Sequence, residues 1–546
     1  MKKTISIIIS ILFSCVISMA QEKGYVSASL ESTNHFYVED QANSFLPSNQ
    51  IQLGEDGFYA SNNYLKVDYY KGRLSAGGQL EGYFPYIVGY PSNLKKMSLS
   101  NLYINWKDDS YSVTVGTFYD QFGSGLLFRS WEDRTLGLNN ALLGARATYN
   151  FRNYAAVKLL WGIPRLGTGN DNGEFFGFGL TKVNVAGADL SVSLSDIFKM
   201  ETASLAIEGS ILNKHETVTQ ELAEKGYASD ILGWSGRVNF EYDGFFAKGE
   251  HVDAGKQMVN PFTPPTKGEA QLIELGYNGR GLGVAMTGRR MKHMVQKLCT
   301  YNLMGSDNPV NNILSYRPAM TTQYTYMLTT LNPYSPEIGE KVYRSGEVGG
   351  QIDAFYNFRR GSRIGGKRGM KVHANFSTYY SLEGSDGTSS ELLFRDFSFD
   401  VEKQWTKKFK TTLLYSMQEY NKNHENNDVY IGLSHIVVAD LLYKFTSKFS
   451  TRMELQYLAS KDDQKDWMAG LLEVNFAPHW SIFASDMYNH GQSKLHYYNA
   501  GVSFAMNHLR VAAGYGRYRA GFICSGGVCR EIPSYTGANL TLTASF

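Results

Sequence analysis

Long hydrophobic runs are missing from this 546-residue sequence after residue 20, and the mean hydropathy is only −0.29. A helix that crosses a membrane needs roughly 18 or more consecutive apolar residues. No membrane-spanning helix is therefore expected after Gln21. A chain can still cross a membrane with strands, because only every second residue of such a strand has to be apolar.

Proline is also scarce, and neither sign of charge dominates. The 13 prolines stand against 54 glycines, 37 tyrosines and 31 phenylalanines. This balance favours long strands, since proline cannot donate to a sheet ladder and aromatic residues suit strands. The 53 basic and 51 acidic residues form no basic tail of the kind that nucleic acid requires, so no nucleic-acid partner is expected. Composition alone would also fit a soluble, secreted β-protein.

The first 20 residues have the pattern of a secretory signal peptide. Lys2 and Lys3 precede an apolar run, and Ser18-Met19-Ala20 offers small residues for cleavage before Gln21. Two alternatives remain open: a short membrane anchor, and a lipoprotein leader that uses Cys15. The sequence predicts two parts, a signal peptide over 1–20 and a single domain over 21–546.

The last residues form a strand with one apolar and one polar face. The apolar face is Ala538, Leu540, Leu542, Ala544 and Phe546. Asn539, Thr541, Thr543 and Ser545 alternate with it, as strand geometry requires for two different environments. A terminal strand that ends on an aromatic residue resembles the C-terminal β-signal of bacterial outer-membrane barrels. The resemblance implies that Leu540, Leu542 and Phe546 form a signal for the barrel-assembly machinery, with outer-membrane lipid around the folded protein.

Similar alternation repeats along the chain, often with charges on the polar face. Arg452, Glu454 and Asp400 occupy such faces and cannot line a dry core, but they can line a water-filled lumen. Short connections alternate with mostly longer ones, the pattern of short periplasmic turns and long extracellular loops. The eleven short turns are expected around Gly72, Asp108, Arg152, Gly187, Gly244, Gly279, Gly361, Lys407, Lys448, Pro478 and His508. We therefore predict an all-β fold: a single large transmembrane antiparallel β-barrel of about 24 strands (22–26).

One stretch does not fit this count easily. Residues 190–194 and 205–207 both resemble strands, but the turn expected at Gly187 leaves room for only one crossing there. We assign the second to a long loop over 197–231.

The segment 116–134 carries an unusual concentration of charge. With Arg146 it places six charged residues within 27 positions, namely Asp120, Arg129, Glu132, Asp133, Arg134 and Arg146. Opposed charges are a common means of selecting solutes in pores. The functional hypothesis is that this loop folds inward and forms a charged constriction. The alternative is an ordinary surface loop with solvated charges.

The same segment resembles an uncharacterised family of Bacteroidota outer-membrane barrels, which are porin-like. The resemblance is sharp over 116–147, with its Gln121-Phe122-Gly123 and Glu132-Asp133-Arg134, and over 519–532. Elsewhere it is limited to the general architecture. It implies a location in the outer membrane and a barrel fold, and it implies no reaction.

Cys524 and Cys529 flank two glycines in the last loop and can close a tight ring. In an oxidising compartment we expect a disulfide, with a metal site as the weaker alternative because no second cysteine pair or histidine pair is near. Cys299 is expected to be a small buried residue.

The sequence shows no catalytic constellation, so no enzyme, cofactor or metal is expected. The leading interpretation is a porin-like channel in which inward-folded loops restrict the lumen. No globular plug precedes the first expected strand, which argues against a plugged receptor. The alternative is a structural subunit of an outer-membrane complex with a filled lumen, whose protein partner would bind the Met- and Tyr-rich loop 294–345.

Overall fold

The computed structural model describes residues 24–53, 57–91, 94, 97–165, 178–258, 264–294, 298–299, 301, 346–382, 389–421, 431–462, 465–525 and 528–546. Of residues 522–525, 528–529 and 531 only the backbone is described. The predicted signal peptide lies outside the described residues, as does most of the predicted partner loop 294–345.

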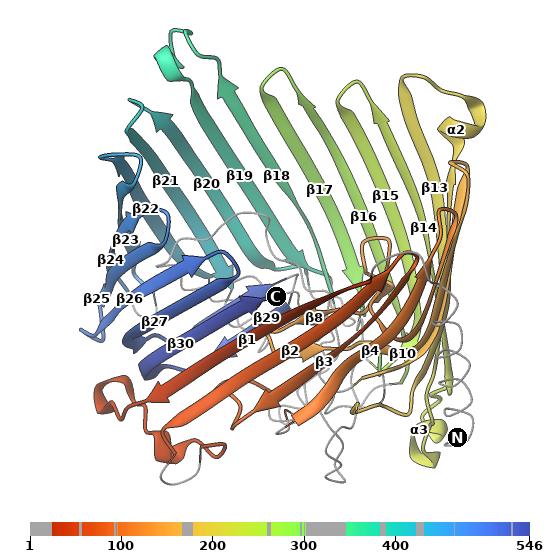
Figure 1. The fold of residues 1–546 in the computed structure, drawn as a ribbon. Coiled ribbons are helices and arrows are strands. Elements are labelled where there is room, and N and C mark those ends of the chain that lie inside the picture. Colours follow the sequence, from red (N-terminus) through yellow and green to blue (C-terminus); the bar gives the residue numbers. More distant parts are fainter. Residues whose placement is uncertain are drawn as a thin grey trace.

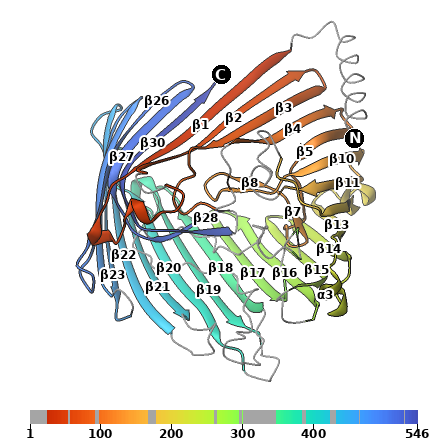
Figure 2. The ribbon, with the colours of Figure 1, turned by 90° about the horizontal axis from the view of Figure 1, so that it is seen from below.

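The wall of the molecule is one closed antiparallel sheet of 24 strands, as predicted (Figures 1 and 2). Consecutive wall strands pair with each other around the ring. The wall strands are β1 (Tyr25–Tyr37), β2 (Tyr59–Lys71), β3 (Leu74–Tyr83), β4 (Met97–Lys107), β5 (Tyr111–Phe118), β10 (Leu142–Phe151), β11 (Ala155–Pro164), β12 (Asn184–Ser193), β13 (Ala203–His215), β14 (Asp230–Tyr242), β15 (Phe245–Gln257), β16 (Thr266–Gly279), β17 (Leu282–Lys292), β18 (Gly346–Phe358), β19 (Met370–Ser381), β20 (Leu392–Gln404), β21 (Phe409–Asn421), β22 (Ile431–Lys444), β23 (Phe449–Ser460), β24 (Trp467–Phe476), β25 (Trp480–Asn489), β26 (His496–Met506), β27 (Leu509–Tyr518) and β30 (Tyr535–Ser545).

The ring closes between the two ends of the described chain. β30 pairs with β1 from Ser29↔Ser545 to Tyr37↔Gly537. The contact reaches the last residue: the backbone N–H of Phe546 donates to the carbonyl of Ala28 at 2.8 Å, and the carbonyl of Phe546 accepts from the N–H of Ala28 at 3.0 Å. No wall strand is therefore left with an open edge.

The outer surface is apolar where the strands cross the middle of the wall. On β23, Leu455 is 50% exposed whereas the neighbouring Gln456, which points inward, is 6% exposed. Met453 and Tyr457, on the same face as Leu455, are exposed as well. Large apolar side chains outside and polar ones inside are the arrangement of a barrel that faces lipid.

Aromatic side chains gather at the end of the barrel that carries the short turns. Phe449 stacks between Phe445 and Phe476, with ring centroids 4.9 and 5.2 Å apart, and Trp480 lies 4.7 Å from Phe504. These residues flank three consecutive turns on β22–β27. Aromatic belts of this kind mark the boundary between lipid and water.

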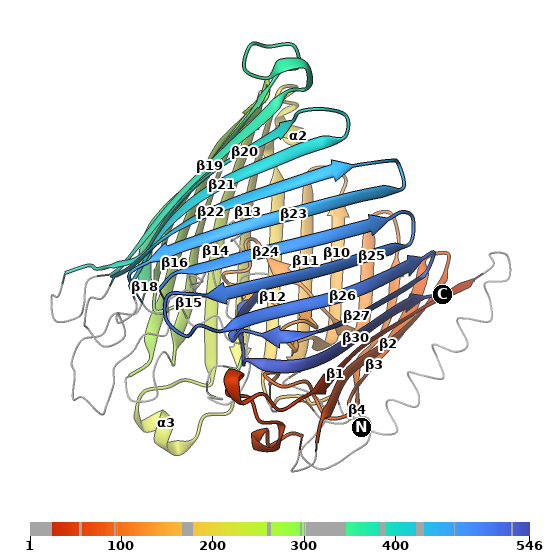
Figure 3. The same cartoon turned by 90° about the vertical axis from the view of Figure 1, so that its left-hand side faces the viewer.

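Ten of the eleven predicted short turns connect consecutive strands at the expected places. The turn predicted at Gly187 is wrong, because Gly187 lies within β12 and pairs with Leu160 and Leu212 on its two sides. The turn is instead formed by α2 (Leu194–Phe198), which Ser193 caps. It lies at the opposite end of the barrel from α3 (Gln220–Glu224) (Figures 1 and 3).

The loop predicted over 197–231 is therefore also wrong in its bounds. Residues 203–215 form the strand β13, and only residues 216–229 connect it to β14. Both stretches that resemble strands, 190–194 and 205–207, belong to wall strands apart from Leu194, and the error came from placing the turn at Gly187. The strand count was unaffected, since the turn was displaced rather than added.

The interior holds short strand pairs from two of the long connections. The remaining elements are β6 (Gln121–Phe122), β7 (Phe128–Arg129), β8 (Glu132–Asp133), β9 (Leu138–Asn139), β28 (Gly521–Ser525), β29 (Val528–Ile532), and the 3-10 turns η1 (Gln41–Asn43), η2 (Pro47–Asn49) and η3 (Gly366–Arg368). Seen along the barrel, β7, β8 and β28 lie within the ring of wall strands (Figure 2).

Candidate functional site

Residues 119–141, here called the inner segment, connect β5 to β10 and lie against the inside of the wall. Two miniature hairpins shape it: Gln121 and Phe122 pair with Arg129 and Phe128, and β8 pairs with β9. Local pairing of this kind satisfies backbone groups that would otherwise be stranded away from water. The segment therefore has a fixed structure of its own.

Apolar contacts anchor the first hairpin. Phe122 and Phe128 are 0% and 1% exposed, with ring centroids 5.1 Å apart. They belong to a cluster with wall residues from β10 to β17, which includes Leu160, Val185, Leu212, Val252 and Met291. Burying one phenylalanine side chain contributes about 1.5–3 kcal/mol. The cluster therefore fixes the first hairpin against the wall through apolar contacts that exclude water.

Gly187 explains how Phe122 fits against β12. A Cβ at Gly187 would lie 2.8 Å from the ring of Phe122, closer than real contacts allow. The absence of a side chain at Gly187 therefore admits the aromatic ring against a continuous strand.

Asp120 attaches the start of the segment to the neighbouring strands. Its carboxylate accepts a hydrogen bond from Lys158 on β11 at 2.6 Å and lies 3.3 Å from the guanidinium of Arg146 on β10. Arg146 also donates to the carbonyl of Tyr119 at 3.3 Å. The predicted residues Asp120 and Arg146 are thus in direct contact.

Arg134 attaches the second hairpin to the other side of the barrel. It donates to Glu31 on β1 and to Gln79 on β3, both at 2.8 Å, and stacks over the ring of Tyr64 at 4.6 Å. Burial acts against its charge, but Glu132 and Glu31 together raise the pKa of Arg134 above its usual value.

Glu132 lies beside this contact. It accepts a hydrogen bond from Gln79 at 2.6 Å and from Asn139 at 3.3 Å, and its carboxylate is 3.8 Å from Arg134. Burial nevertheless raises the pKa of Glu132 above its usual value, although Arg134 and Gln79 act in the opposite direction.

The other two predicted charges have local partners. Arg129 stacks on the ring of Trp131 at 3.8 Å, and burial lowers its pKa. Asp133 accepts the backbone N–H of Leu136 at 3.0 Å and so fixes the turn into β9. Five of the six predicted residues lie in the inner segment, and Arg146 lies on the wall strand β10. Asp120, Glu132 and Arg134 bind the wall. Their role in selecting solutes stays a prediction.

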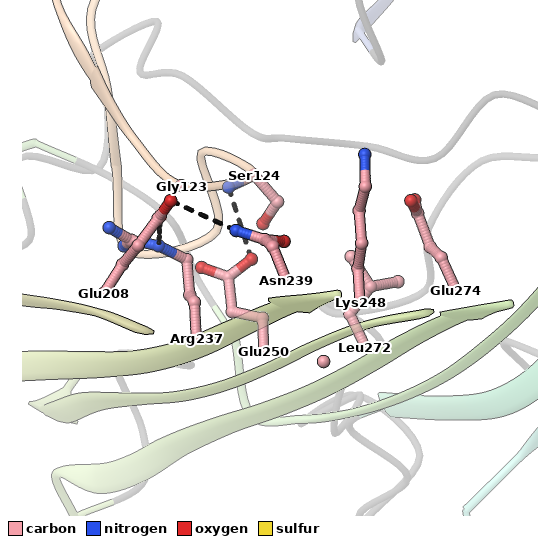
Figure 4. Close-up of a pocket in the computed structure, with 10 residues that line it drawn as sticks. Gly123, Ser124, Glu208, Arg237, Asn239, Lys248, Glu250, Leu272 and Glu274 are labelled. Carbon is pink, nitrogen blue, oxygen red and sulfur yellow. Dashed lines mark hydrogen bonds and ion pairs between the residues drawn. The ribbon is translucent and has the colours of Figure 1, made fainter. Parts of the chain in front are cut away.

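The tip of the first hairpin reaches β14 and β15. Gly123 has a φ of +52°, and a Cβ there would lie 2.5 Å from Arg237 and 2.6 Å from Glu250. The next residue, Ser124, donates its backbone N–H to Glu250 at 3.2 Å (Figure 4). Only glycine allows the chain to approach the wall this closely in this conformation.

The last loop contributes the second inward element, the hairpin of β28 and β29. Arg530 donates to the carbonyl of Gly89 at 2.7 Å and to that of Thr135 at 3.1 Å, and it stacks on Tyr90 at 3.9 Å. Thr135 belongs to the inner segment, so the two segments that carry the family resemblance meet at Arg530. This contact could not be read from their positions almost 400 residues apart.

In this hairpin, Cys524 and Cys529 pair directly across the two strands in the backbone register. Their side chains lie outside the described part of the structure, and the disulfide stays a prediction. Cys299 is 1% exposed, as expected.

The opposite half of the wall, β18–β24, carries charges that solvent reaches. His373 bridges Asp353 and Asp400 at 2.8 and 2.7 Å. Arg452 pairs with Asp440 at 2.8 Å, and each of these two side chains is 27% exposed. Charges of this exposure indicate a wet inner wall on this side.

Four wall residues that hold the inner segment were not predicted from the sequence, namely Glu31, Gln79, Lys158 and Glu250. Their signal was present as charged or polar residues on the inward faces of strands. Which of them meets the segment depends on the curvature of the barrel.

Fold and interior together define a membrane-spanning β-barrel whose lumen is partly filled by its own connections. The chain belongs to a family of unknown function, DUF6029, whose model matches residues 1–546. The expected membership of a barrel family is thereby confirmed at the level of family and fold. Within the described residues, none of the helices has the length and hydropathy to cross a membrane. The same residues contain no group of three or more His, Cys, Asp or Glu side chains placed to hold a metal ion.

Three solved structures illustrate what the fold is similar to. The siderophore receptor PirA from Pseudomonas aeruginosa is 9% identical with a TM-score of 0.41, and the match covers 96% of this chain and 81% of that one. OccAB3 from Acinetobacter baumannii is 8% identical, with a TM-score of 0.37 and coverage of 96% and 99%. A BenF-like porin from Pseudomonas fluorescens Pf-5 is 7% identical, with a TM-score of 0.35 and coverage of 97% and 99%. No curated protein matches the sequence. Similarities this low assign no function.

Proposed function

We propose that the protein is an outer-membrane channel for small polar solutes, with the short turns in the periplasm and the long loops outside the cell. The observation that supports this is the division of the lumen into two halves. The inner segment packs on the walls formed by β1–β3 and β10–β17, whereas the wall of β18–β24 carries solvent-exposed charges. A solute would pass along the charged wall, and the inner segment would set the width of the passage.

Single-channel recording in a planar bilayer tests this proposal. Folded protein is first verified by the shift of its gel mobility on heating. The informative variant replaces residues 121–139 with a short flexible linker, which leaves the strands β5 and β10 paired with their neighbours. Larger conductance steps than those of the wild type are expected.

A control for this variant shortens the turn 361–367 at the other end of the barrel, which is expected to leave the steps unchanged. Equal steps in wild type and segment variant would show that the inner segment does not narrow the passage. Silence of both folded proteins would contradict the channel.

The second candidate is a structural subunit with a filled lumen. The observation that favours it is that Arg530 joins three connections. Arg530 lies in the hairpin of β28 and β29, and its side chain donates to the carbonyl of Gly89, between β3 and β4, and to that of Thr135 in the inner segment. A stoichiometric partner that co-purifies with a silent barrel would support this candidate. The partner loop 294–345 and an origin in Bacteroidota remain expectations of the same kind.

A further inference from the structure

A cavity of about 310 Å³ lies between the inner wall of β13–β16 and the tip of the inner segment (Figure 4). Ser124 and Gly123 cover it on the lumen side. Its charged and amide lining residues are Glu208, Arg237, Asn239, Lys248, Glu250 and Glu274. Leu272 adds an apolar patch. A cavity of this size suits a small organic solute and is far larger than a single ion.

Glu250 is the residue that points to a ligand. It is only 8% exposed, and its side chain rises from β15 towards the segment tip (Figure 4). One carboxylate oxygen, Oε2, accepts the N–H of Ser124. The other, Oε1, accepts no hydrogen bond from the described residues. A buried carboxylate oxygen without a donor is unfavourable unless a bound group supplies one.

The nearest cation does not fill this role. Arg237 donates through Nε to Glu208 at 2.6 Å and through Nη1 to Ser210 and Ser235 at 2.6 and 3.0 Å. Its remaining nitrogen donates to Asp189. Within the described residues its hydrogen-bond partners are all on β12, β13 and its own strand, so its charge is already balanced by two other carboxylates.

Lys248 and Glu274 stand at the other end of the cavity. They are directly opposite in the register of β15 and β16, yet no ion pair within 4.0 Å joins them in the described structure. Both side chains extend away from the wall, side by side (Figure 4). Glu250 and Glu274 thus face a single ammonium, so the cavity has an excess of negative charge.

We propose that this cavity binds a small organic solute with a primary ammonium group, in the class of diamines and basic amino acids. The inference rests on the proposed channel and names the class of solute that would bind transiently during passage. The ammonium donates to Oε1 of Glu250, and Leu272 contacts the methylene chain. Glu274 holds a second ammonium, and Lys248 provides for a carboxylate where the solute has one.

Titration calorimetry on the folded protein in detergent tests the proposal with 1,5-diaminopentane as the probe. Glutarate, with the same number of carbons and opposite charges, is the contrasting probe and is expected not to bind. Glu250→Gln keeps the size and the bond to Ser124 but removes the charge. It should weaken binding by about tenfold or more, as expected for the loss of a charge-assisted hydrogen bond.

Glu473→Gln is the matched control, because it removes one carboxylate from the far wall on β24. It should leave binding unchanged. An equal loss in both variants would mean that the diamine responds to the overall charge of the lumen, and the proposal would fail. If Glu250→Gln does not fold, Glu274→Gln takes its place, with binding equal to the wild type as the contradicting result.

The outcome is independent of conductance. A protein that conducts but binds no diamine contradicts this inference and leaves the channel intact. A protein that binds the diamine but never conducts contradicts the channel and supports the cavity.

Discussion

Arg134 shows how single residues hold the interior together. Its two wall partners lie 103 and 55 positions away in the sequence, on β1 and β3. Asp120 binds β10 and β11 near the start of the inner segment, so the two residues together attach the segment to two separate parts of the wall. The charges in this segment therefore act first as attachments.

Replacing Arg134 with Met should loosen the segment. The change leaves Glu31 and Glu132 without their cation, and we expect the docked segment to lose about 1–2 kcal/mol, since Glu31 is partly exposed and its interaction is screened. Limited proteolysis of the folded barrel measures this as faster cleavage within 119–141. Arg73→Met, which removes an exposed pair with Asp108 at a turn, is the control and should cleave at the wild-type rate.

Glu132 should make the stability of the docked segment depend on pH. Burial raises the pKa of Glu132 in the folded protein above its usual value of 4.5. The ionised carboxylate therefore destabilises the folded state, fully at a pH above the raised pKa and not at all at a pH below 4.5. The wild type should therefore gain stability relative to Glu132→Gln as the pH falls from neutral towards 4.5. Thermal unfolding of both proteins across this window is the measurement. Parallel curves would contradict the raised pKa.

The wall strands could be predicted well from the sequence, and the interior poorly. Strands and turns leave local signals, namely alternation and the residues at each reversal, and the turns at Gly72, Lys407 and Pro478 were found from these alone. Gly187 misled because a glycine that admits an aromatic ring looks the same as a turn glycine. The contacts of Arg530 and Glu250 depend on which side of a curved wall each strand occupies, which no local pattern encodes.

A disulfide between Cys524 and Cys529 should link β28 to β29. The two residues face each other across antiparallel strands, and the predicted compartment is oxidising. Mass spectrometry of the unreduced protein after alkylation should find neither cysteine labelled. Cys299 serves as the internal reference, since it should be labelled once the protein is unfolded. Two labelled thiols in the hairpin would contradict the bond.

For the whole molecule, the decisive feature is closure of the ring by β30. Leu540 faces outward and is 37% exposed, whereas Thr541 faces the interior. A lysine in place of Leu540 puts a charge against lipid, which costs about 1–4 kcal/mol depending on depth. The heat-shifted band of the folded barrel should decrease for Leu540→Lys and persist for Thr541→Lys. Equal yields would show that this face does not meet lipid.

The pairing of β1 with β30 has a consequence for how the chain folds. All other wall pairings join strands that follow each other, so hairpins can form early from nearby residues. The pairing of β1 with β30 joins residues 500 to 516 positions apart, from Tyr37↔Gly537 to Ser29↔Ser545, and before it forms the sheet has two unpaired edges. Such edges recruit strands from other molecules. Until β30 pairs with β1, two copies of this protein can therefore pair through their open edges and aggregate.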